Sequence, residues 1–327
     1  MNNALTIGFT GDVMLGRTLD RIISKKGYDY PWGDVLPLMR STDINIINLE
    51  TTLTSSCRKV YKAFNFKAAP DKVKCLINAR VSVANLANNH ILDYGDEGLE
   101  ETINTLDAAN IAHVGAGKNL AAAIAPVVVD LNNMHVGILA ITDNEPGWKA
   151  GWQPGTNYAN ISEEEDYTRL LQAMKNLKNE VDIIIITVHW GPNMRNEPTR
   201  DLVQFAHLMS EEGAHIIHGH SAHIIQAVEH YKNSLILYDT GDFIDDYIVD
   251  PYQRNDLAAF FVVMVDRCGP LSLKIVPTRI FQYQVTVARN DDRNWILNRI
   301  NYLSSAFGTQ LDEEGSIDLR AALLGPA

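Results

Sequence analysis

Short apolar runs alternate with segments of helical periodicity along most of the chain, which is typical of layered α/β proteins. The runs are rich in Ile and Val and are mostly free of polar residues, as expected for strands that are covered on both faces. The clearest helix is predicted behind Asp96, a candidate N-cap, because Leu99, Ile103 and Leu106 then repeat at helical spacing. A second helix is predicted from Ser162.

Two pairs of apolar runs are separated only by short polar or Gly-Pro turns, which favours antiparallel hairpins. We therefore expect either one mixed sheet or two sheets. The chain shows no internal repeat, low-complexity segment or linker, so we expect a single domain over residues 1–327 with a loosely packed tail over residues 308–327. The first hairpin joins the runs at 127–131 and 136–141, and the second joins those at 260–265 and 273–276.

Several apolar runs end on residues that favour metals or protons. In an open α/β sheet, ligands bind outside the carboxyl ends of the strands, so side chains from distant parts of the sequence converge there. This pattern predicts one metal-dependent or acid/base site built from the whole chain. The run ends in question are Gly11-Asp12, Glu50, Asn88-Asn89-His90, His189 and the segment from His218 to His223.

The segment from His218 to His223 is the strongest element of this pattern. It holds three histidines within six residues, and His189 ends a strand of its own. Neutral imidazole is a common ligand for zinc and also suits manganese or iron. A lone histidine is more often structural, but this grouping favours ligands at His189, His220 and His223, whereas His218 fits a packing role.

The other run ends each allow a plainer interpretation. Asn88-Asn89-His90 fits either a polar turn or an Asn oxygen on a metal beside a His proton donor. Asp12 fits a helix N-cap, and Glu50 fits the start of a turn. Either carboxylate also suits a cation with oxygen ligands, and the convergence of the run ends favours that interpretation.

Residues near these run ends are candidates for binding the substrate. Arg17, Lys67 and Arg195 could each pair with a phosphate or a carboxylate. Trp190 fits either a substrate wall or ordinary core. Asp242 belongs to an acidic segment that also fits a solvated loop, and it is the member we most expect near the site.

Composition narrows the partners and the compartment. The net charge of −12, without a Lys/Arg cluster, argues against a nucleic-acid partner. The three cysteines are an odd number without Cys-x-x-Cys spacing, so they suit a reducing compartment. We see neither a signal peptide nor an apolar run approaching the roughly 18 residues of a membrane span. We therefore expect a cytoplasmic protein with no membrane span.

Taken in order, these segments resemble the CapA family of poly-γ-glutamate capsule-synthesis proteins, a branch of the calcineurin-like metallophosphoesterases. The resemblance runs from about Thr6 to Tyr247. It implies an α/β fold, a four-layer α-β-β-α sandwich of two mixed sheets. The motifs that carry it are Gly11-Asp12-Val13-Met14-Leu15-Gly16-Arg17, Asn48-Leu49-Glu50-Thr51, Leu86-Ala87-Asn88-Asn89-His90, Asp93-Tyr94-Gly95, His189-Trp190-Gly191, Gly219-His220-Ser221-Ala222-His223 and Gly241-Asp242-Phe243.

The resemblance also implies roles for single residues. Asp12 and His223 would bind a first divalent metal, and Glu50 would bridge to a second. His90 would be the general acid, so we expect His90, Asp12 and His220 to be catalytic. The implied cofactors are one or two ions of Mn, Zn or Fe. Asn89, His189 and His220 would complete the second metal site.

This chain departs from ordinary metallophosphoesterases at three positions, which it shares with the CapA branch. Met14 stands where a His is usual, Glu50 stands where an Asp is usual, and His220 and His223 are three residues apart instead of two. The first metal site thereby loses an imidazole, so a site without metal is an open alternative.

The expected function is hydrolysis of a phosphoester or an amide in a small-molecule, polyglutamate-like or peptide substrate. One alternative is a metal-independent peptide epimerase, as in a relative that acts on lasso-peptide precursors. A non-catalytic scaffold in capsule biosynthesis is the other. The sequence predicts no oligomeric state.

Overall fold

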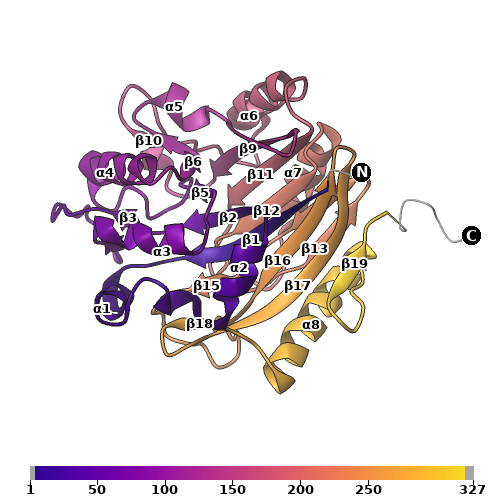
Figure 1. The fold of residues 1–327 in the computed structure, drawn as a ribbon. Helices are drawn as coiled ribbons and strands as arrows, with labels where there is room; N and C mark the ends of the chain where they lie inside the picture. Colours follow the sequence, from indigo (N-terminus) through magenta and orange to yellow (C-terminus); the bar gives the residue numbers. More distant parts are fainter. Residues whose placement is uncertain (1–3, 321–327) are drawn as a thin grey trace, which may run out of the picture.

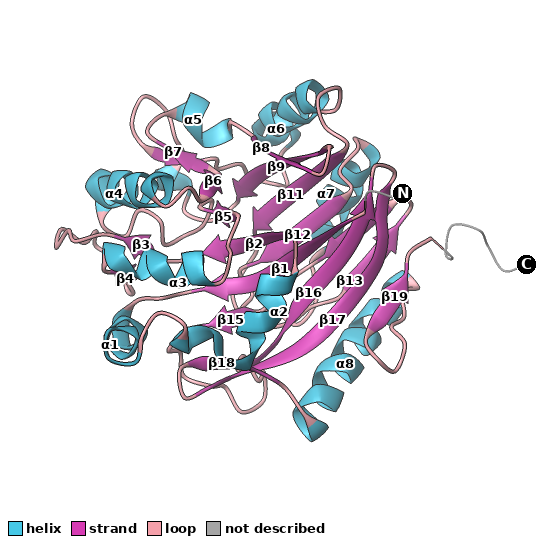
Figure 2. Cartoon of the chain, in the orientation of Figure 1, coloured by secondary structure: helices cyan, strands magenta, loops and turns pink. Residues whose placement is uncertain are grey.

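Two large sheets face each other in the centre of the molecule, and helices cover their outer faces (Figures 1 and 2). The structure is a computed structural model that describes residues 4–320. Ile7 and Ile46 of one sheet and Ile138 and Ile185 of the other belong to one buried cluster between the sheets. Both sheets are mixed, so the predicted four-layer α-β-β-α fold is confirmed.

The first sheet has the strand order β18-β17-β16-β1-β2-β5-β6, with β15 also paired to β1 and β19 to β17. Strands β1, β2, β5 and β6 are parallel, whereas β16 to β18 are antiparallel additions. Its strands are β1 (Leu5–Val13), β2 (Ile44–Leu49), β5 (Val83–Asn85), β6 (Ala112–Val114), β15 (Asp242–Ile244), β16 (Leu257–Asp266), β17 (Gly269–Phe281), β18 (Gln284–Val287) and β19 (Ser316–Asp318).

The second sheet has the order β13-β14-β12-β11-β9-β8, with a parallel centre of β9, β11, β12 and β14. Two short two-stranded ladders, β3-β4 and β7-β10, lie outside the large sheets. The second-sheet strands are β8 (Val127–Leu131), β9 (Met134–Thr142), β11 (Ile183–His189), β12 (Ile216–His220), β13 (Val228–Tyr231) and β14 (Ser234–Leu237). The short strands are β3 (Thr52–Leu53), β4 (Lys67–Ala68), β7 (Ala116–Gly117) and β10 (Gly155–Thr156).

Helices pack on each outer face through their apolar sides. Buried residues of α1 to α4 form one cluster with the first sheet, and those of α6 and α7 form another with the second sheet. Helix α8 instead places Ile296 and Ile300 in the cluster between the sheets. The helices are α1 (Arg17–Lys26), α2 (Leu36–Ser41), α3 (Val73–Asn78), α4 (Gly95–Ala108), α5 (Leu120–Ile124), α6 (Glu164–Leu177), α7 (Arg200–Glu211) and α8 (Asn290–Ser304), with 3₁₀ turns at Tyr30–Val35, Pro70–Lys72, Pro146–Trp148 and Ser305–Phe307.

The two predicted helices and both predicted hairpins are present. Helix α4 begins at Gly95, so Asp96 lies in its first turn and is not the N-cap. Helix α6 begins at Glu164, two residues after Ser162. The hairpins are β8-β9 and β16-β17, both antiparallel. No helix within residues 4–320 is long and apolar enough to cross a membrane.

The expected loose tail is packed as far as the structure describes it. Strand β19 pairs with β17, and Leu311 and Leu319 are buried. Weak periodicity hid this short strand, because three residues are too few to show a pattern. Residues 321–327 of the expected tail lie outside the described residues.

Candidate metal centre

Strands from both sheets deliver the predicted residues to one place. Asp12 of β1 is in register with Asn48 of β2 and with Asp242 of β15. In the other sheet, His189 ends β11 directly beside His220 at the end of β12. Parallel neighbours end at the same edge of a sheet, so these polar residues come together although they are far apart in the sequence.

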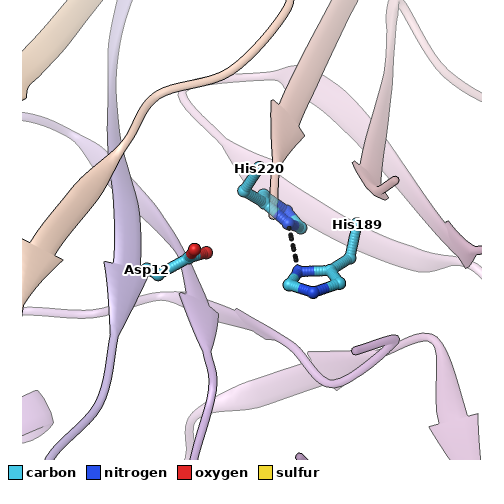
Figure 3. Close-up of side chains that lie close together, drawn as sticks. All are labelled: Asp12, His189 and His220. Carbon is cyan, nitrogen blue, oxygen red and sulfur yellow. Dashed lines mark hydrogen bonds between the residues drawn. The ribbon is translucent and has the colours of Figure 1, made fainter. Parts of the chain in front are cut away.

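Two groups of three buried residues there offer ligand atoms that all lie within 4.8 Å of one another. Asp12 with His189 and His220 forms one group (Figure 3). Asp12 with Glu50 and His223 forms the other. Asp12 is therefore the residue that both groups share, whereas the family resemblance gave the shared position to Glu50.

The donor atoms of both groups fit a divalent cation. Oδ2 of Asp12, both carboxylate oxygens of Glu50 and Nε2 of His189 are buried and have no hydrogen-bond partner. Buried polar atoms are normally paired, and a role in binding an ion is one of the few explanations for a cluster of exceptions. Carboxylate oxygen and imidazole nitrogen together suit Zn, Mn or Fe.

The histidines of the first group are held neutral, which is the form that binds a metal. Burial lowers the pKa of His189 to about 3 and holds the pKa of His220 well below its ordinary value. Their Nδ1 atoms lie 3.1 Å apart. Asn48 Nδ2 lies 2.7 Å from Asp12 Oδ1 and 3.3 Å from His189 Nδ1, so this amide helps to set the group's geometry.

His223 lies among carboxylates in the second group. Burial alone would lower its pKa, but Asp242 and Glu50 raise that pKa well above its ordinary value. Its Nδ1 lies 2.8 Å from Asp242 Oδ1 and 3.2 Å from Asp12 Oδ2. Burial together with the charge of Asp12 raises the pKa of Glu50. Without a cation, this group therefore keeps protons that a metal would displace.

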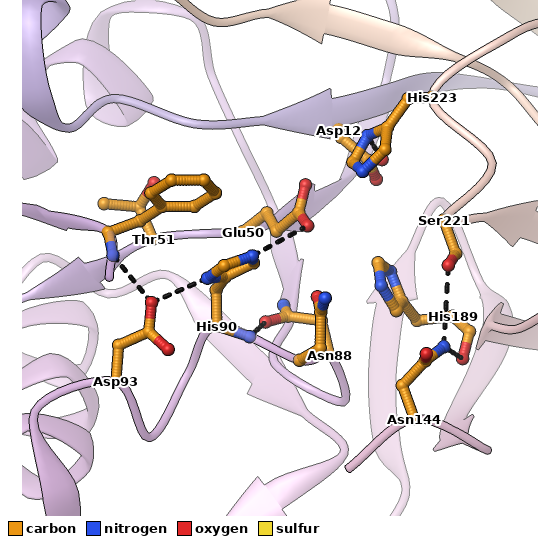
Figure 4. A network of polar contacts seen from close by, with 12 residues as sticks. Asp12, Glu50, Thr51, Asn88, His90, Asp93, Asn144, His189, Ser221 and His223 are labelled. Carbon is orange, nitrogen blue, oxygen red and sulfur yellow. Dashed lines mark hydrogen bonds and ion pairs between the residues drawn. The ribbon is translucent and has the colours of Figure 1, made fainter. Parts of the chain in front are cut away.

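His90 lies beside the second group, with Asp93 and Glu50 facing its two ring nitrogens (Figure 4). Its Nδ1 is 2.6 Å from Asp93 Oδ2, and its Nε2 is 3.7 Å from Glu50 Oε1. The ring of Phe66 stacks on the imidazole with 3.8 Å between the ring centroids. An imidazole oriented in this way by a carboxylate is suited to donate or accept a proton at Nε2.

The two asparagines before His90 have different roles. Asn88 is fully buried, and its amide donates to Asn48 Oδ1 and Leu49 O while its oxygen accepts from the backbone N–H of His90. Asn89 Oδ1 is buried without a partner. The side-chain oxygen of Asn89 is therefore available as the metal ligand that the family resemblance implies.

A cavity of about 290 Å³ adjoins the centre. His90 and His223 line it together with the predicted substrate residue Arg17. The rest of its lining is largely apolar and is made of Phe64, Phe66, Asn193, Met194, Tyr247, Ile248 and Asn255.

The structure does not bring the other four predicted substrate residues to this cavity. Lys67 donates to Ser56 O, and Arg195 donates to Glu197 O. Trp190 is buried in the core of the second sheet, where its indole N–H donates to Tyr238 O. Asp242 is fully buried against His223.

Several residues of the site were not singled out from the sequence. Asp93 and Asn48 stand inside the motifs that carry the resemblance, so their position was the available signal. Asn85 follows two apolar residues in β5, and its amide donates to Asn48 Oδ1. Phe66 and Tyr247 line the cavity from segments without a recognisable pattern.

The family described as "Bacterial capsule synthesis protein PGA_cap" matches residues 6–247. The chain belongs to this family. Its match spans every residue of the two metal-ligand groups, so the candidate centre lies wholly within the PGA_cap part of the chain.

Three relatives of this PGA_cap protein have names that refer to polyglutamine synthesis, capsule biosynthesis or PGA biosynthesis. The "Probable polyglutamine synthesis accessory protein Rv0574c" of Mycobacterium tuberculosis is 29% identical, over 94% of this chain and 93% of that protein. The "Capsule biosynthesis protein CapA" of Bacillus anthracis is 31% identical, over 85% of this chain and 68% of that protein. The "PGA biosynthesis protein CapA" of Bacillus subtilis is 30% identical, over 75% of this chain and 64% of that protein.

Among solved structures, the crystal structure of TT1561 of Thermus thermophilus matches with 12% sequence identity and a TM-score of 0.43. The match covers 81% of this chain and 100% of that chain.

Proposed function

We propose that this PGA_cap protein is a metal-dependent hydrolase that cleaves an amide or a phosphoester in a polyglutamate-like or peptide substrate. One observation carries the proposal: buried ligand atoms without hydrogen-bond partners cluster around Asp12, directly beside a cavity that His90 lines. The names of the relatives favour a polyglutamate-like substrate, since they refer to capsule and polyglutamine synthesis.

Each residue has a defined task in this proposal. Asp12, Glu50 and His223 would hold one divalent cation, and Asp12, His189 and His220, with Asn89, would hold another. Such cations lower the pKa of water and polarise the group under attack. His90, oriented by Asp93, gives its Nε2 proton to the leaving group.

For an amide the reaction balances as simple hydrolysis. The C–N bond breaks, the oxygen of one water molecule joins the acyl carbon, and the leaving nitrogen takes a proton through His90. His90 then regains a proton from that water. No oxidant or further reactant is required.

Metal content and activity test the proposal together. Wild-type protein and the single variants Asp12→Ala and His223→Ala are each dialysed against Mn or Zn and analysed for bound metal. We expect Asp12→Ala to lose metal from both groups and His223→Ala to keep the metal at His189 and His220. Release of glutamate from poly-γ-glutamate is then measured with and without added metal. A wild-type protein that binds no metal and responds to none would refute the proposal.

A second candidate, a metal-independent peptide epimerase, has one observation in its favour. Two His–carboxylate pairs, His90–Asp93 and His223–Asp242, present their imidazoles to one cavity. An epimerase needs two such groups, because one removes the Cα proton and the other returns it. Incubation of candidate peptides in deuterium oxide with a chelator would show Cα exchange as a mass increase. Exchange that survives the chelator would favour this candidate over the hydrolase.

A further inference from the structure

Arg17 lies at the edge of the cavity, between two aromatic rings and a buried carboxylate. The carbon at the centre of its guanidinium lies 5.5 Å from the ring centroid of Phe66 and 6.0 Å from that of Tyr247. Its Nε lies 3.2 Å from Oδ1 of Asp246, whose side chain is only 2% exposed. These contacts favour one orientation of the long side chain, which lowers the conformational entropy that binding a ligand would otherwise cost.

The terminal nitrogens of Arg17 remain free to bind. Within residues 4–320, Nη1 and Nη2 meet no hydrogen-bond acceptor, while Nε faces Asp246. The Arg17 side chain is 40% exposed and lines the cavity with His90 and His223. The guanidinium therefore presents two parallel donor groups, the geometry that a carboxylate or a phosphate accepts.

Helix stability does not explain a cation at this position. Arg17 is the first residue of α1, where the helix dipole disfavours positive charge. Its backbone also adopts φ of +57°, a left-handed conformation that residues other than glycine rarely adopt. Strain of this kind is commonly kept where a side chain must point to a ligand.

The surroundings favour a single carboxylate over a phosphate. Asp246 already offsets part of the Arg17 charge, and Arg17 is the only Lys or Arg that lines the described cavity. A carboxylate needs only the one guanidinium, which it can accept through two parallel hydrogen bonds, whereas a phosphate dianion carries a second charge that no further Lys or Arg of the cavity lining would offset.

Phe66 places this anion site next to the candidate acid. Its ring contacts the Arg17 guanidinium and stacks on the His90 imidazole. A substrate carboxylate on Arg17 would thus lie close to the leaving group that His90 protonates. The cavity of about 290 Å³ is at the lower end of ligand sites, which suits one residue on each side of a scissile bond.

We propose that Arg17 is the specificity-determining residue and binds the α-carboxylate on the carbon attached to the scissile amide nitrogen. This inference rests on the proposed hydrolase function and narrows its substrate to amides with that carboxylate. Such an α-carboxylate lies beside every amide of a γ-linked glutamate chain. In an ordinary α-linked peptide it lies beside the last amide only.

Calorimetric binding with three dipeptides tests the inference. The probes are γ-glutamyl-glutamate, α-linked glutamyl-glutamate, and γ-glutamyl-glutamate whose α-carboxylate beside the amide nitrogen is converted to a carboxamide. A chelator is present, so that metal-dependent turnover does not consume the probes. Wild-type protein is compared with Arg17→Gln, Arg17→Lys and the matched control Arg21→Gln. Arg21 lies one turn further along α1 and is exposed.

We expect wild type and Arg21→Gln to bind the carboxylate probe about tenfold or more tightly than the carboxamide probe. Arg17→Gln should lose this preference, and Arg17→Lys should keep only part of it because lysine lacks the fork. Tighter binding of the γ-linked probe points to the polymer, and equal or tighter binding of the α-linked probe points to peptide ends. Both outcomes support the α-carboxylate site.

Equal wild-type affinity for the carboxylate and carboxamide probes would overturn the inference. So would an unchanged preference in Arg17→Gln. Thermal unfolding shows whether Arg17→Gln is folded. If it is not folded, the comparison of wild type with Arg17→Lys tests the inference. Hydrolysis of the same probes is measured separately, with Mn or Zn added and no chelator. Selective binding without any hydrolysis in that assay would leave the anion site standing and remove the proposed function. Hydrolysis that is indifferent to Arg17 would do the reverse.

Discussion

The Nδ1 atom of His90 lies 2.6 Å from Oδ2 of Asp93, and the same carboxylate oxygen accepts the backbone N–H of Phe66 at 2.6 Å. Asp93 therefore fixes both the imidazole and the ring that stacks on it. Burial raises the pKa of Asp93 to about 7, and Lys62 lies 3.3 Å from its other oxygen. One buried carboxylate thus orients the candidate acid and one wall of the cavity.

This relationship predicts that Asp93→Asn lowers kcat about tenfold or more while bound metal stays unchanged. The amide would orient His90 less well and would not stabilise its charged form. Steady-state kinetics and metal analysis measure the two effects. Asp107→Asn is the matched control, since Asp107 also faces a histidine, His113, but its side chain is 62% exposed. A kcat that does not change in Asp93→Asn would contradict the role given to Asp93.

The unpaired ligand atoms predict that metal stabilises the folded protein. Addition of Mn or Zn at about a hundred times its Kd should raise the free energy of unfolding by about 2.7 kcal/mol, and a chelator should reverse the gain. Asp12→Asn should abolish most of the gain because Asp12 belongs to both groups. Thermal unfolding with and without metal measures this gain in stability. Equal metal-induced shifts in wild type and Asp12→Asn would contradict this arrangement of ligands.

The close approach of β1 to the segment before β15 predicts a severe effect of Gly11→Ala. A Cβ at Gly11 would lie 1.8 Å from the carbonyl oxygen of Gly241, so the two backbones would have to separate. We expect a loss of about 1–3 kcal/mol or more in the free energy of unfolding, measured by urea denaturation. Gly147→Ala is the control, since nothing lies within 4 Å of a Cβ there. Equal stability of both variants would contradict the predicted clash.

The partly buried His215 predicts part of the acid sensitivity. Burial lowers its pKa, and its Nδ1 accepts the backbone N–H of Ile184 at 3.0 Å. Below about pH 6.5 the unfolded chain takes up a proton that the folded protein resists, so stability falls as pH falls toward the folded pKa. His215→Asn keeps an acceptor that does not titrate. Its free energy of unfolding should therefore fall less than that of wild type between about pH 7.5 and about pH 5.

Urea denaturation at both pH values measures this difference. His135→Asn serves as the control because His135 lies on the surface, with a side chain that is 46% exposed. We expect the control to follow wild type. If His215→Asn does so as well, His215 makes no contribution to the acid sensitivity.

The sequence located the segments of the site better than the individual residues. The alternation of apolar runs and polar ends placed Asp12, His189 and His220 correctly in one cluster, because strand ends at one sheet edge must be neighbours. The four-layer fold followed from the family resemblance, because apolar runs alone do not tell one mixed sheet from two.

The cavity wall was less predictable, because neighbours along an extended chain point to opposite sides. Lys67 was expected at the substrate, but its neighbour Phe66 lines the cavity. Met194 also lines the cavity and Arg195 does not, but there the cause is a turn, in which Met194 adopts φ of +57°. Trp190 follows His189 and belongs to the outer core. Only the three-dimensional register of each segment decides which side chain faces inward.

The pairing of Asp12 in β1 with Asp242 in β15 has a consequence for biosynthesis. Strand β1 leaves the ribosome first, but its partner emerges only after most of the chain has been translated. Contacts between such distant segments form late and slowly, so the cluster of Asp12 with His223 and Asp242 closes only after strand β15 has been translated. If this cluster binds metal as proposed, translation products that end before β15 should take up less metal than the complete chain.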